Sequence, residues 1–466
     1  MKPEEPALLI DFGSTYTKVV VVDLGKEEII GQTQAVTTAE TDITIGLRKA
    51  LERLPGFLGQ EARTFPHKLV CSSAAGGLRV IAIGLVPELT AKAARLAALG
   101  AGARVLAVYS HHLTLHELQE IVKQEPDMIL LAGGTDGGDE RVILHNARVL
   151  ASSALTVPIV VAGNKDAAEE VEAILRQGGK EVQVTENVMP QLGRINVDPA
   201  RQAIRQLFME HIVEAKGFKA AESYVGRILM PTPAAVMRAA KLLALGTDLE
   251  EGLGELMIVD VGGATTDVHS IAAGEPQDST VIQRGLPDPY AKRTVEGDLG
   301  LRVSAVSLIE AVVQERLRMQ IGLRRQLDLT RVARNLSRDI GHIPHSAEEQ
   351  AIDEGMARAA VELSVARHVG TLRELYLPTG HCFVQEGKDL TRIKHLIGTG
   401  GIFCHTTRAK EILSAALFAR ANPFLLKPKA PTLWIDQRYI LWAMGLLAEI
   451  SPETAVHLMR KHLLEV

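Results

Sequence analysis

The sequence has few of the residues that mark several well-known classes of protein. Only three of its 466 residues are cysteines, Cys71, Cys382 and Cys404, and they include no Cys-x-x-Cys pair. This spacing argues against a disulfide framework, a zinc ribbon or a cysteine-ligated cluster, and it suits a reducing compartment. Aromatic residues make up 4% of the chain, which is too few to favour stacking on nucleic-acid bases.

Long apolar runs and a basic excess are also missing. No run of about 18 apolar residues occurs, so the sequence predicts no membrane-spanning helix, and its polar start does not resemble a signal peptide. The formal net charge of -5 lacks the excess of Lys and Arg that favours nucleic acid or anionic membranes. We therefore expect a cytoplasmic protein whose partners are neither nucleic acid nor a membrane.

The residues that are present predict a folded protein of more than one domain. Apolar residues make up 46% and charged residues 23% of the chain, which are ordinary values for a globular protein. At roughly 150 residues per domain, the length corresponds to two large or three smaller domains.

Two segments, about 250 residues apart, share one pattern. Each has an apolar run that ends in Asp, then a turn rich in Gly, Ser or Thr, and then a second apolar run. The first covers residues 8–23 with Asp11 before the turn, and the second covers residues 256–269 with Asp260 before the turn. Both predict β-hairpins, and their repetition predicts two related lobes.

The two predicted turns have the composition of phosphate-binding loops. Glycine lets backbone N–H groups come close to phosphate oxygens, and Ser or Thr adds hydroxyl donors without charge. The lysine of the first hairpin would offer a cation to the outer phosphates. The candidate residues are Gly13, Ser14, Thr15 and Lys18 in the first hairpin, and Gly262, Gly263, Thr265 and Thr266 in the second.

Asp11 and Asp260 would repel a nucleotide unless a cation lay between them. Mg²⁺ fits this place because it keeps several waters and binds one or two carboxylates together with phosphate oxygens. We therefore expect ATP and Mg²⁺, with the metal held by Asp11 and Asp260 through water. One of these carboxylates could also orient the attacking water, and Asp267 is a third candidate for positioning water or metal. For either turn alone, a plain tight hairpin is the alternative, and two such turns together disfavour it.

A third glycine-rich segment, residues 397–402, follows an apolar step near the C-terminal end. Glycine-rich turns are common, so the segment gains weight only as the third member of this set. It would suit a loop against adenine and ribose. The candidate residues are Gly398, Thr399, Gly400 and Gly401.

Between the hairpins, apolar strands alternate with helical patterns over about residues 79–185, which predicts a parallel α/β layer. We expect a first α/β lobe over residues 1–225 that contains this layer as an insertion. The second α/β lobe would cover residues 226–466. Beyond the second hairpin the pattern is mostly helical, with a helical subdomain over about residues 303–395.

In their order along the chain, the three segments resemble the two phosphate loops and the adenosine loop of the actin, Hsp70 and sugar kinase ATPase superfamily. The resemblance implies a two-lobed actin/Hsp70-like ATPase fold (ASKHA, ribonuclease H-like) of the α/β class, with ATP and Mg²⁺ in the cleft. Five further motifs resemble the GlmL family, also called glutamate mutase MutL, so that the likeness spans roughly residues 8–402. These motifs are residues 71–79, 130–138, 185–190, 230–235 and 293–300.

The GlmL family is associated with adenosylcobalamin-dependent aminoacid mutases. The resemblance therefore implies an ATP-driven accessory or reactivating chaperone, a slow Mg²⁺-dependent ATPase, whose partners are mutase subunits of the glutamate mutase type. Self-association is left open. Two alternatives remain: a small-molecule kinase of the same superfamily, with Asp136 or Asp267 as its catalytic carboxylate, and an actin-like structural protein.

Three weaker features have plainer explanations. Glu296 and Asp298 would stabilise the start of a helix near Val303 through its dipole, with a nucleotide contact as the alternative. Residues 267–272 nearly match the Asp-x-His-x-x-Gly pattern of base-off cobalamin binding, but His269 falls on a predicted strand, so we expect the partner to carry the corrin. Cys71 is expected to be a small buried residue rather than a nucleophile.

Overall fold

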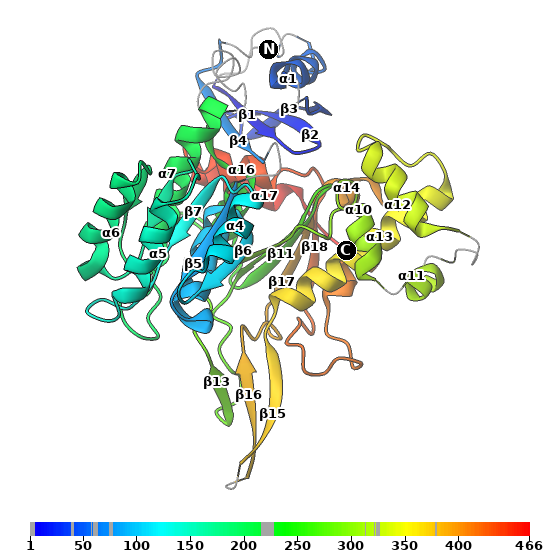
Figure 1. Ribbon diagram of the computed structural model, residues 1–466. Helices are drawn as coiled ribbons and strands as arrows, with labels where there is room; N and C mark the ends of the chain where they lie inside the picture. The colour runs from blue at the N-terminus through cyan, green and yellow to red at the C-terminus, as the bar shows by residue number, and fades with distance from the viewer. Residues whose placement is uncertain are drawn as a thin grey trace. The chain divides into compact units, whose positions relative to one another are not determined.

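The computed structural model describes residues 5–38, 42–56, 58, 64–73, 78–215, 228–312, 314–320, 322, 327–377 and 380–466 (Figure 1). The chain divides into two compact units. Unit 1 comprises Met1–Ala75, Gly217–Gln283 and Tyr290–Val466, and unit 2 comprises Gly76–Lys216 and Arg284–Pro289. Among the described residues, no helix is both long enough and apolar enough to cross a bilayer.

Unit 1 contains a first sheet in the order β10-β4-β1-β2-β3. The central strand β1 pairs antiparallel with β2 and parallel with β4, so that the first predicted hairpin lies in the middle of the sheet. Its apolar run Ala7–Ile10 is fully buried. Helix α1 (Ile43–Glu52) begins at Asp42, whose side chain accepts a hydrogen bond from Thr44 N. The strands are β1 (Pro6–Phe12), β2 (Tyr16–Asp23), β3 (Glu28–Val36), β4 (His67–Ser72) and β10 (Ile228–Pro231).

The second sheet of unit 1 has the order β14-β12-β11-β17-β18-β19. Its first five strands correspond to β3-β2-β1-β4-β10, which is the order of the first sheet read from its other edge. Its central strand β11 also pairs antiparallel with the next strand of its hairpin, β12, and parallel with β17. This repetition confirms the predicted two-lobed actin/Hsp70-like fold. The strands are β11 (Leu256–Val261), β12 (Thr266–Ile271), β14 (Ala291–Glu296), β17 (His395–Thr399), β18 (Thr432–Asp436) and β19 (Leu463–Glu465).

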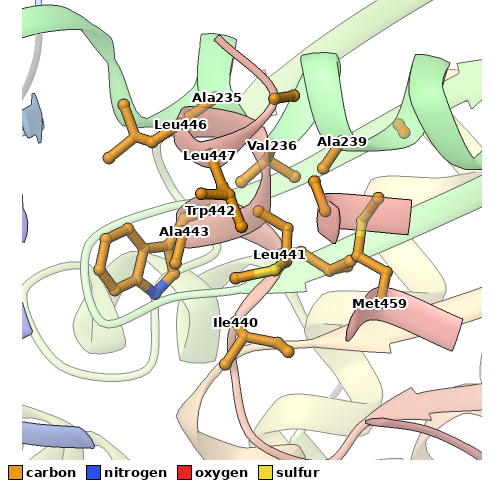
Figure 2. Close-up of a cluster of buried hydrophobic side chains, with 14 of the residues drawn as sticks. Ala235, Val236, Ala239, Ile440, Leu441, Trp442, Ala443, Leu446, Leu447 and Met459 are labelled. Atoms are coloured by element: carbon orange, nitrogen blue, oxygen red, sulfur yellow. The ribbon is translucent and has the colours of Figure 1, made fainter. Parts of the chain in front are cut away.

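Helices α9 (Thr232–Leu245) and α16 (Leu441–Leu447) pack against each other in a core that both sheets share. A Cβ atom at Gly445 would lie 1.8 Å from the carbonyl oxygen of Ala235, so only glycine allows this close approach. Trp442 is 1% exposed and lies in the same cluster (Figure 2). Because this core joins the strands of both lobes in one compact unit, the division into lobes at residue 225 stays a prediction.

Helices follow the second hairpin, as the pattern predicts, among the described residues between 305 and 368. The prediction of mostly helical structure is wrong for residues 371–386, which form the hairpin of β15 (Thr371–Leu377) and β16 (Gly380–Glu386) beside β13 (Val281–Arg284) (Figure 1). Short segments of mixed polar and apolar residues fit helical and strand periods equally well, which is why the pattern misled here. The helices are α10 (Ala305–Ala311), α11 (Gln314–Gln320), α12 (Leu329–Arg338) and α13 (Ala347–His368).

Unit 2 is built on a five-stranded sheet in the order β6-β5-β7-β8-β9, in which all neighbours pair in parallel. This confirms the alternating layer predicted for residues 79–185. The apolar strand β7 (Met128–Leu131) is buried along its whole length, as parallel strands covered on both faces require. The other strands are β5 (Arg79–Gly84), β6 (Arg104–Ser110), β8 (Ile159–Val161) and β9 (Val182–Val184). The helices are η3 (Pro87–Ala91), α3 (Lys92–Ala101), α4 (Leu115–Lys123), α5 (Arg141–Ala151), α6 (Lys165–Gln177) and α7 (Asp198–Ala215).

Candidate nucleotide and metal site

The same hydrogen bond closes both glycine turns of unit 1. Gly13 N–H donates to the Tyr16 carbonyl at 3.1 Å, and Gly262 N–H donates to the Thr265 carbonyl at 2.9 Å. A Cβ at Gly13 would lie 2.6 Å from the Tyr16 oxygen, and a Cβ at Gly262 would lie 2.9 Å from the Thr265 oxygen. The first glycine of each turn is thus required by the turn itself, because any side chain would strike its own hydrogen-bond acceptor.

The two turns meet each other. A Cβ atom at Gly263 of the second turn would lie 2.8 Å from Thr15 Cγ2 of the first turn. The structure therefore brings together two predicted phosphate-binding residues that are 248 positions apart in the chain. Lack of a side chain at Gly263 is what allows the turns to come so close.

Asp11 lies one residue before the end of β1 and is 0% exposed. Across the hairpin it faces Lys18, whose Nζ forms an ion pair with Asp11 Oδ2 at 2.6 Å. Its other oxygen, Oδ1, accepts a hydrogen bond from Thr232 Oγ1 at 2.5 Å and lies 3.6 Å from Cys71 Sγ. Cys71 is fully buried, as the sequence predicts, and burial raises the pKa of its thiol.

Lys18 stays positively charged in this position. Burial alone would lower its pKa, but Asp11 first, then Tyr439 and Asp260, raise the pKa above its usual value. The ammonium also lies 4.1 Å from the ring centroid of Tyr439 and 5.5 Å from that of Trp442, within the range of cation–π attraction. Sequence reasoning missed the two rings, which reach Lys18 from the start of α16.

Asp260 occupies the place of Asp11 in the second hairpin, and its cross-strand neighbour is Asp267. Burial, followed by the charge of Asp267, raises the pKa of Asp260 to about 7, against a lowering by Lys18. Its Oδ1 atom is buried and has no hydrogen-bond partner among the described residues. A buried acceptor without a partner is costly, so this atom is suited to a water or a hydrated cation.

Asp267 is already paired. Arg293 of β14 donates from Nε to Asp267 Oδ1 at 2.7 Å, and its Nη2 atom lies 2.6 Å from the same oxygen. Thr265 Oγ1 donates to the other oxygen at 2.9 Å. Nothing beside Asp267 in the sequence indicates Arg293 as its partner, because the pairing of β12 with β14 brings the two residues together.

The third predicted segment lies at the end of β17, where Thr399 pairs in register with Asp260 of β11. Thr399 Oγ1 donates at 2.8 Å to Asp436, a buried residue at the end of β18 and the fourth carboxylate of this site. Asp436 also accepts hydrogen bonds from the N–H groups of Ile440 and Leu441, at the start of α16. The hydroxyl proton of Thr399 is therefore already donated to a carboxylate of the protein.

The glycines of the third segment differ in their surroundings. Gly400 has a φ of +115°, and a Cβ there would lie 2.3 Å from the carbonyl oxygen of Val261. A Cβ at Gly398 would lie 2.9 Å from the ring of Phe403. Gly401 is exposed with open space around it, so it is the member of this set with room for a ligand.

The charges of this cluster fit a divalent cation. Its four carboxylates belong to Asp11, Asp260, Asp267 and Asp436, and its two cations are Lys18 and Arg293. When all are ionised, two negative charges remain uncompensated. Within the described part of the chain, no group of three or more His, Cys, Asp or Glu side chains could hold a metal by itself. A metal here would therefore draw on one or two carboxylates together with water and phosphate, as Mg²⁺ does.

Glu296 and Asp298 do not stabilise a helix start. Helix α10 begins at Ala305, later than the predicted start near Val303. Arg367 of α13 pairs with Asp298 at 2.8 and 2.9 Å and with Glu296 at 2.7 Å. The prediction was wrong because a partner 69 residues further along the chain takes both carboxylates.

Two other predicted residues have surroundings of their own. His269 lies on β12, as the pattern predicts, and is fully buried, which lowers its pKa to about 3. Asp136 belongs to unit 2, where its Oδ1 accepts hydrogen bonds from Lys165 N at 3.1 Å and Asn187 Nδ2 at 2.9 Å.

Two sheets of one strand order, each with an Asp and a glycine turn at the end of its central strand, define an actin-like ATPase or sugar kinase fold. A family model described as "MutL protein" matches residues 7–463, and the chain belongs to this family. It is 52% identical over 459 residues to "Protein MutL" from Clostridium tetanomorphum, covering 98% of this chain and 99% of that protein. The resemblance inferred from the motifs is thereby confirmed.

Solved structures show much weaker similarity. The activator of the 2-hydroxyisocaproyl-CoA dehydratase from Clostridium difficile with bound ADPNP is 9% identical, with 98% of this chain and 97% of that chain covered and a TM-score of 0.31. A xyloylose kinase from Brucella ovis is 10% identical, with 98% and 92% covered and a TM-score of 0.35. Similarity at this level supports no conclusion about what the chain binds.

Proposed function

We propose that this chain binds ATP with Mg²⁺ between its two glycine turns, hydrolyses it slowly, and uses the cycle to reactivate an adenosylcobalamin-dependent aminoacid mutase in the cytoplasm. The observation that carries the nucleotide assignment is the meeting of the turns at Thr15 and Gly263, in the two hairpins that carry Asp11 and Asp260. Membership of the MutL family supports the mutase as partner.

Each residue of the cluster has a distinct part in this proposal. Hydroxyl and N–H groups of Ser14 and Thr15, together with the N–H group of Thr265, bind phosphate oxygens, and Lys18 supplies a positive charge to them. Mg²⁺, when bound, would neutralise phosphate charge and would be held by Asp11 and Asp260 through water. Positioning and electrostatic stabilisation account for most of the catalysis in phosphoryl transfer.

Asp260 is the carboxylate best suited to receive a proton from the attacking water. Its Oδ1 atom has no partner among the described residues, and its pKa of about 7 matches the working pH of a general base. Asp267 is less suited, because Arg293 and Thr265 already hold its two oxygens. This pairing also disfavours Asp267 as the catalytic carboxylate of a small-molecule kinase.

The nucleotide assignment is tested with Asp11→Asn and Asp260→Asn, with Asp248→Asn on the surface as the matched control. We expect both site variants to lose Mg²⁺-ATP binding and hydrolysis by about a hundredfold, and the control to behave as the parent. Hydrolysis that is unaffected in both site variants would refute the assignment.

The partner is tested with a purified aminoacid mutase inactivated by a damaged corrin. We expect incubation with this chain, ATP, Mg²⁺ and intact adenosylcobalamin to restore mutase activity, and Asp260→Asn to fail. Fast ATP turnover on a small hydroxyl or carboxyl acceptor, without any mutase, would favour the kinase instead. Filaments that sediment with ATP would favour the actin-like structural protein.

A further inference from the structure

We propose that Lys18 makes metal binding conditional on the nucleotide: its ammonium holds Asp11 in the free protein, and phosphate oxygens must draw it away before Asp11 can serve a divalent cation. This inference rests on the proposed function, and it deepens it by setting an order of binding. It predicts that the free protein discriminates against free Mg²⁺ and accepts the metal only together with a nucleotide.

Both oxygens of Asp11 are engaged in the structure. Oδ2 is paired with Lys18 Nζ at 2.6 Å, and Oδ1 accepts the hydroxyl of Thr232 at 2.5 Å. Asp11 itself is 0% exposed, so water does not compete for these places. A cation that approaches Asp11 therefore meets a carboxylate whose charge is already neutralised.

The ammonium is held in place from its other side. The rings of Tyr439 and Trp442 lie 4.1 and 5.5 Å from Nζ, and the Lys18 side chain is only 12% exposed. Like charges repel strongly where water is excluded, so this fixed ammonium opposes a second cation on the same carboxylate. A nucleotide changes the balance, because its phosphates attract both the ammonium and the metal.

The second hairpin has no such arrangement. The position equivalent to Lys18 is Asp267, so no cation faces Asp260 across the hairpin, and Asp260 Oδ1 has no partner among the described residues. Free metal would thus find only one of its two carboxylates available. The ion pair is thus specific to Asp11, although the charge of Lys18 also lowers the pKa of Asp260.

The test measures Mn²⁺, in place of Mg²⁺, by electron paramagnetic resonance with the full chain, first without nucleotide and then with ADP. We expect weak Mn²⁺ binding to the nucleotide-free parent, and about tenfold tighter binding to Lys18→Met, a size usual for coupling between two sites. Lys18→Arg keeps the positive charge and should stay weak. Lys26→Met is the matched control, because Lys26 pairs with Asp23, at 3.6 Å, rather than with Asp11.

Three results would overturn the proposal. The first is a folded Lys18→Met variant that, without nucleotide, binds Mn²⁺ no more tightly than the parent does. The second is a parent that binds Mn²⁺ equally tightly with and without ADP and loses this binding in Asp11→Asn. The second comparison does not depend on whether Lys18→Met folds. The third is a parent that binds no nucleotide, which refutes both the proposed function and the conditional metal site. Where the parent does bind nucleotide, either of the first two results refutes the conditional metal site alone.

Discussion

Lys18 and Asp267 occupy equivalent places in two hairpins of the same topology, and they carry opposite charge. Lys18 faces Asp11 and neutralises it, whereas Asp267 faces Asp260 and raises its pKa. One duplicated scaffold thus gives one carboxylate that is paired with a cation and one whose pKa is raised to about 7. The predictions below follow from this asymmetry and from the packing that supports it.

The contribution of Asp260 to the stability of the metal-free protein should fall as the pH rises from about 4 to 7, whereas buried His269, with its pKa lowered to about 3, acts in the opposite direction below about pH 6.5. Over this window the folded protein keeps a proton on Asp260, with its pKa of about 7, that the unfolded chain releases, so rising pH favours unfolding. Asp260→Asn stays neutral and should remove this part of the loss, of the order of 2 kcal/mol after allowance for partial exposure. Urea unfolding with a chelator at pH 5, 6, 7 and 8 measures it. Equal pH profiles for the parent and Asp260→Asn, with Asp248→Asn as reference, would contradict the prediction.

Binding of Mg²⁺ with nucleotide should release a proton from the same carboxylate below pH 7, because a cation near Asp260 favours its ionised form. Calorimetry in two buffers of different ionisation enthalpy measures the number of protons released. We expect the release to approach one at pH 6 and to vanish above pH 8. A release that does not depend on pH would contradict this role of Asp260.

Gly263→Ala should force the two glycine turns apart. Its Cβ would lie 2.8 Å from Thr15 Cγ2, so we expect about 1 kcal/mol of lost stability and weaker nucleotide binding. Thr15→Ser removes the methyl group but keeps the hydroxyl, so the double variant should recover both properties. Measuring nucleotide affinity and urea unfolding for the three variants tests the contact, and a double variant no better than Gly263→Ala would speak against it.

Gly445→Ala should cost about 3 kcal/mol, because its Cβ would strike the backbone oxygen of Ala235 at 1.8 Å and separate α9 from α16. Gly401→Ala is the matched control, since a Cβ there meets nothing within 4 Å. Thermal and urea unfolding of both variants measures the difference. Equal stability of the two variants would show that the helices are not held together in this way.

Arg293→Met should destabilise the protein by about 3–5 kcal/mol, because it leaves the carboxylate of Asp267, 6% exposed, without its ion pair. Adding Asp267→Asn should restore much of that loss, since the amide carries no charge to bury. A double-mutant cycle by urea unfolding measures the coupling. Additive effects of the two substitutions would refute the ion pair as a source of stability.

The sequence predicts most of what depends on local pattern. Apolar runs and turn residues within a few positions of each other predict each hairpin and the alternating layer of unit 2. Thr232 and Arg293 lie in segments that resemble family motifs, but their contacts with Asp11 and Asp267 have no local sign, because strand order and helix packing create these contacts between distant parts of the chain. The same holds for Tyr439 and Lys18. Asp436 could have been found: β18 ends Leu-Trp-Ile-Asp, much as β1 has Leu-Leu-Ile-Asp and β11 has Met-Ile-Val-Asp.

The shared core also determines when the protein can fold. The apolar face of β1, with Leu9, packs in one cluster with Trp442 of α16, near the other end of the chain. A ribosome must therefore synthesise the chain as far as α16 before this face of β1 is fully covered. Until then the nascent first sheet exposes apolar surface, which makes it prone to aggregation.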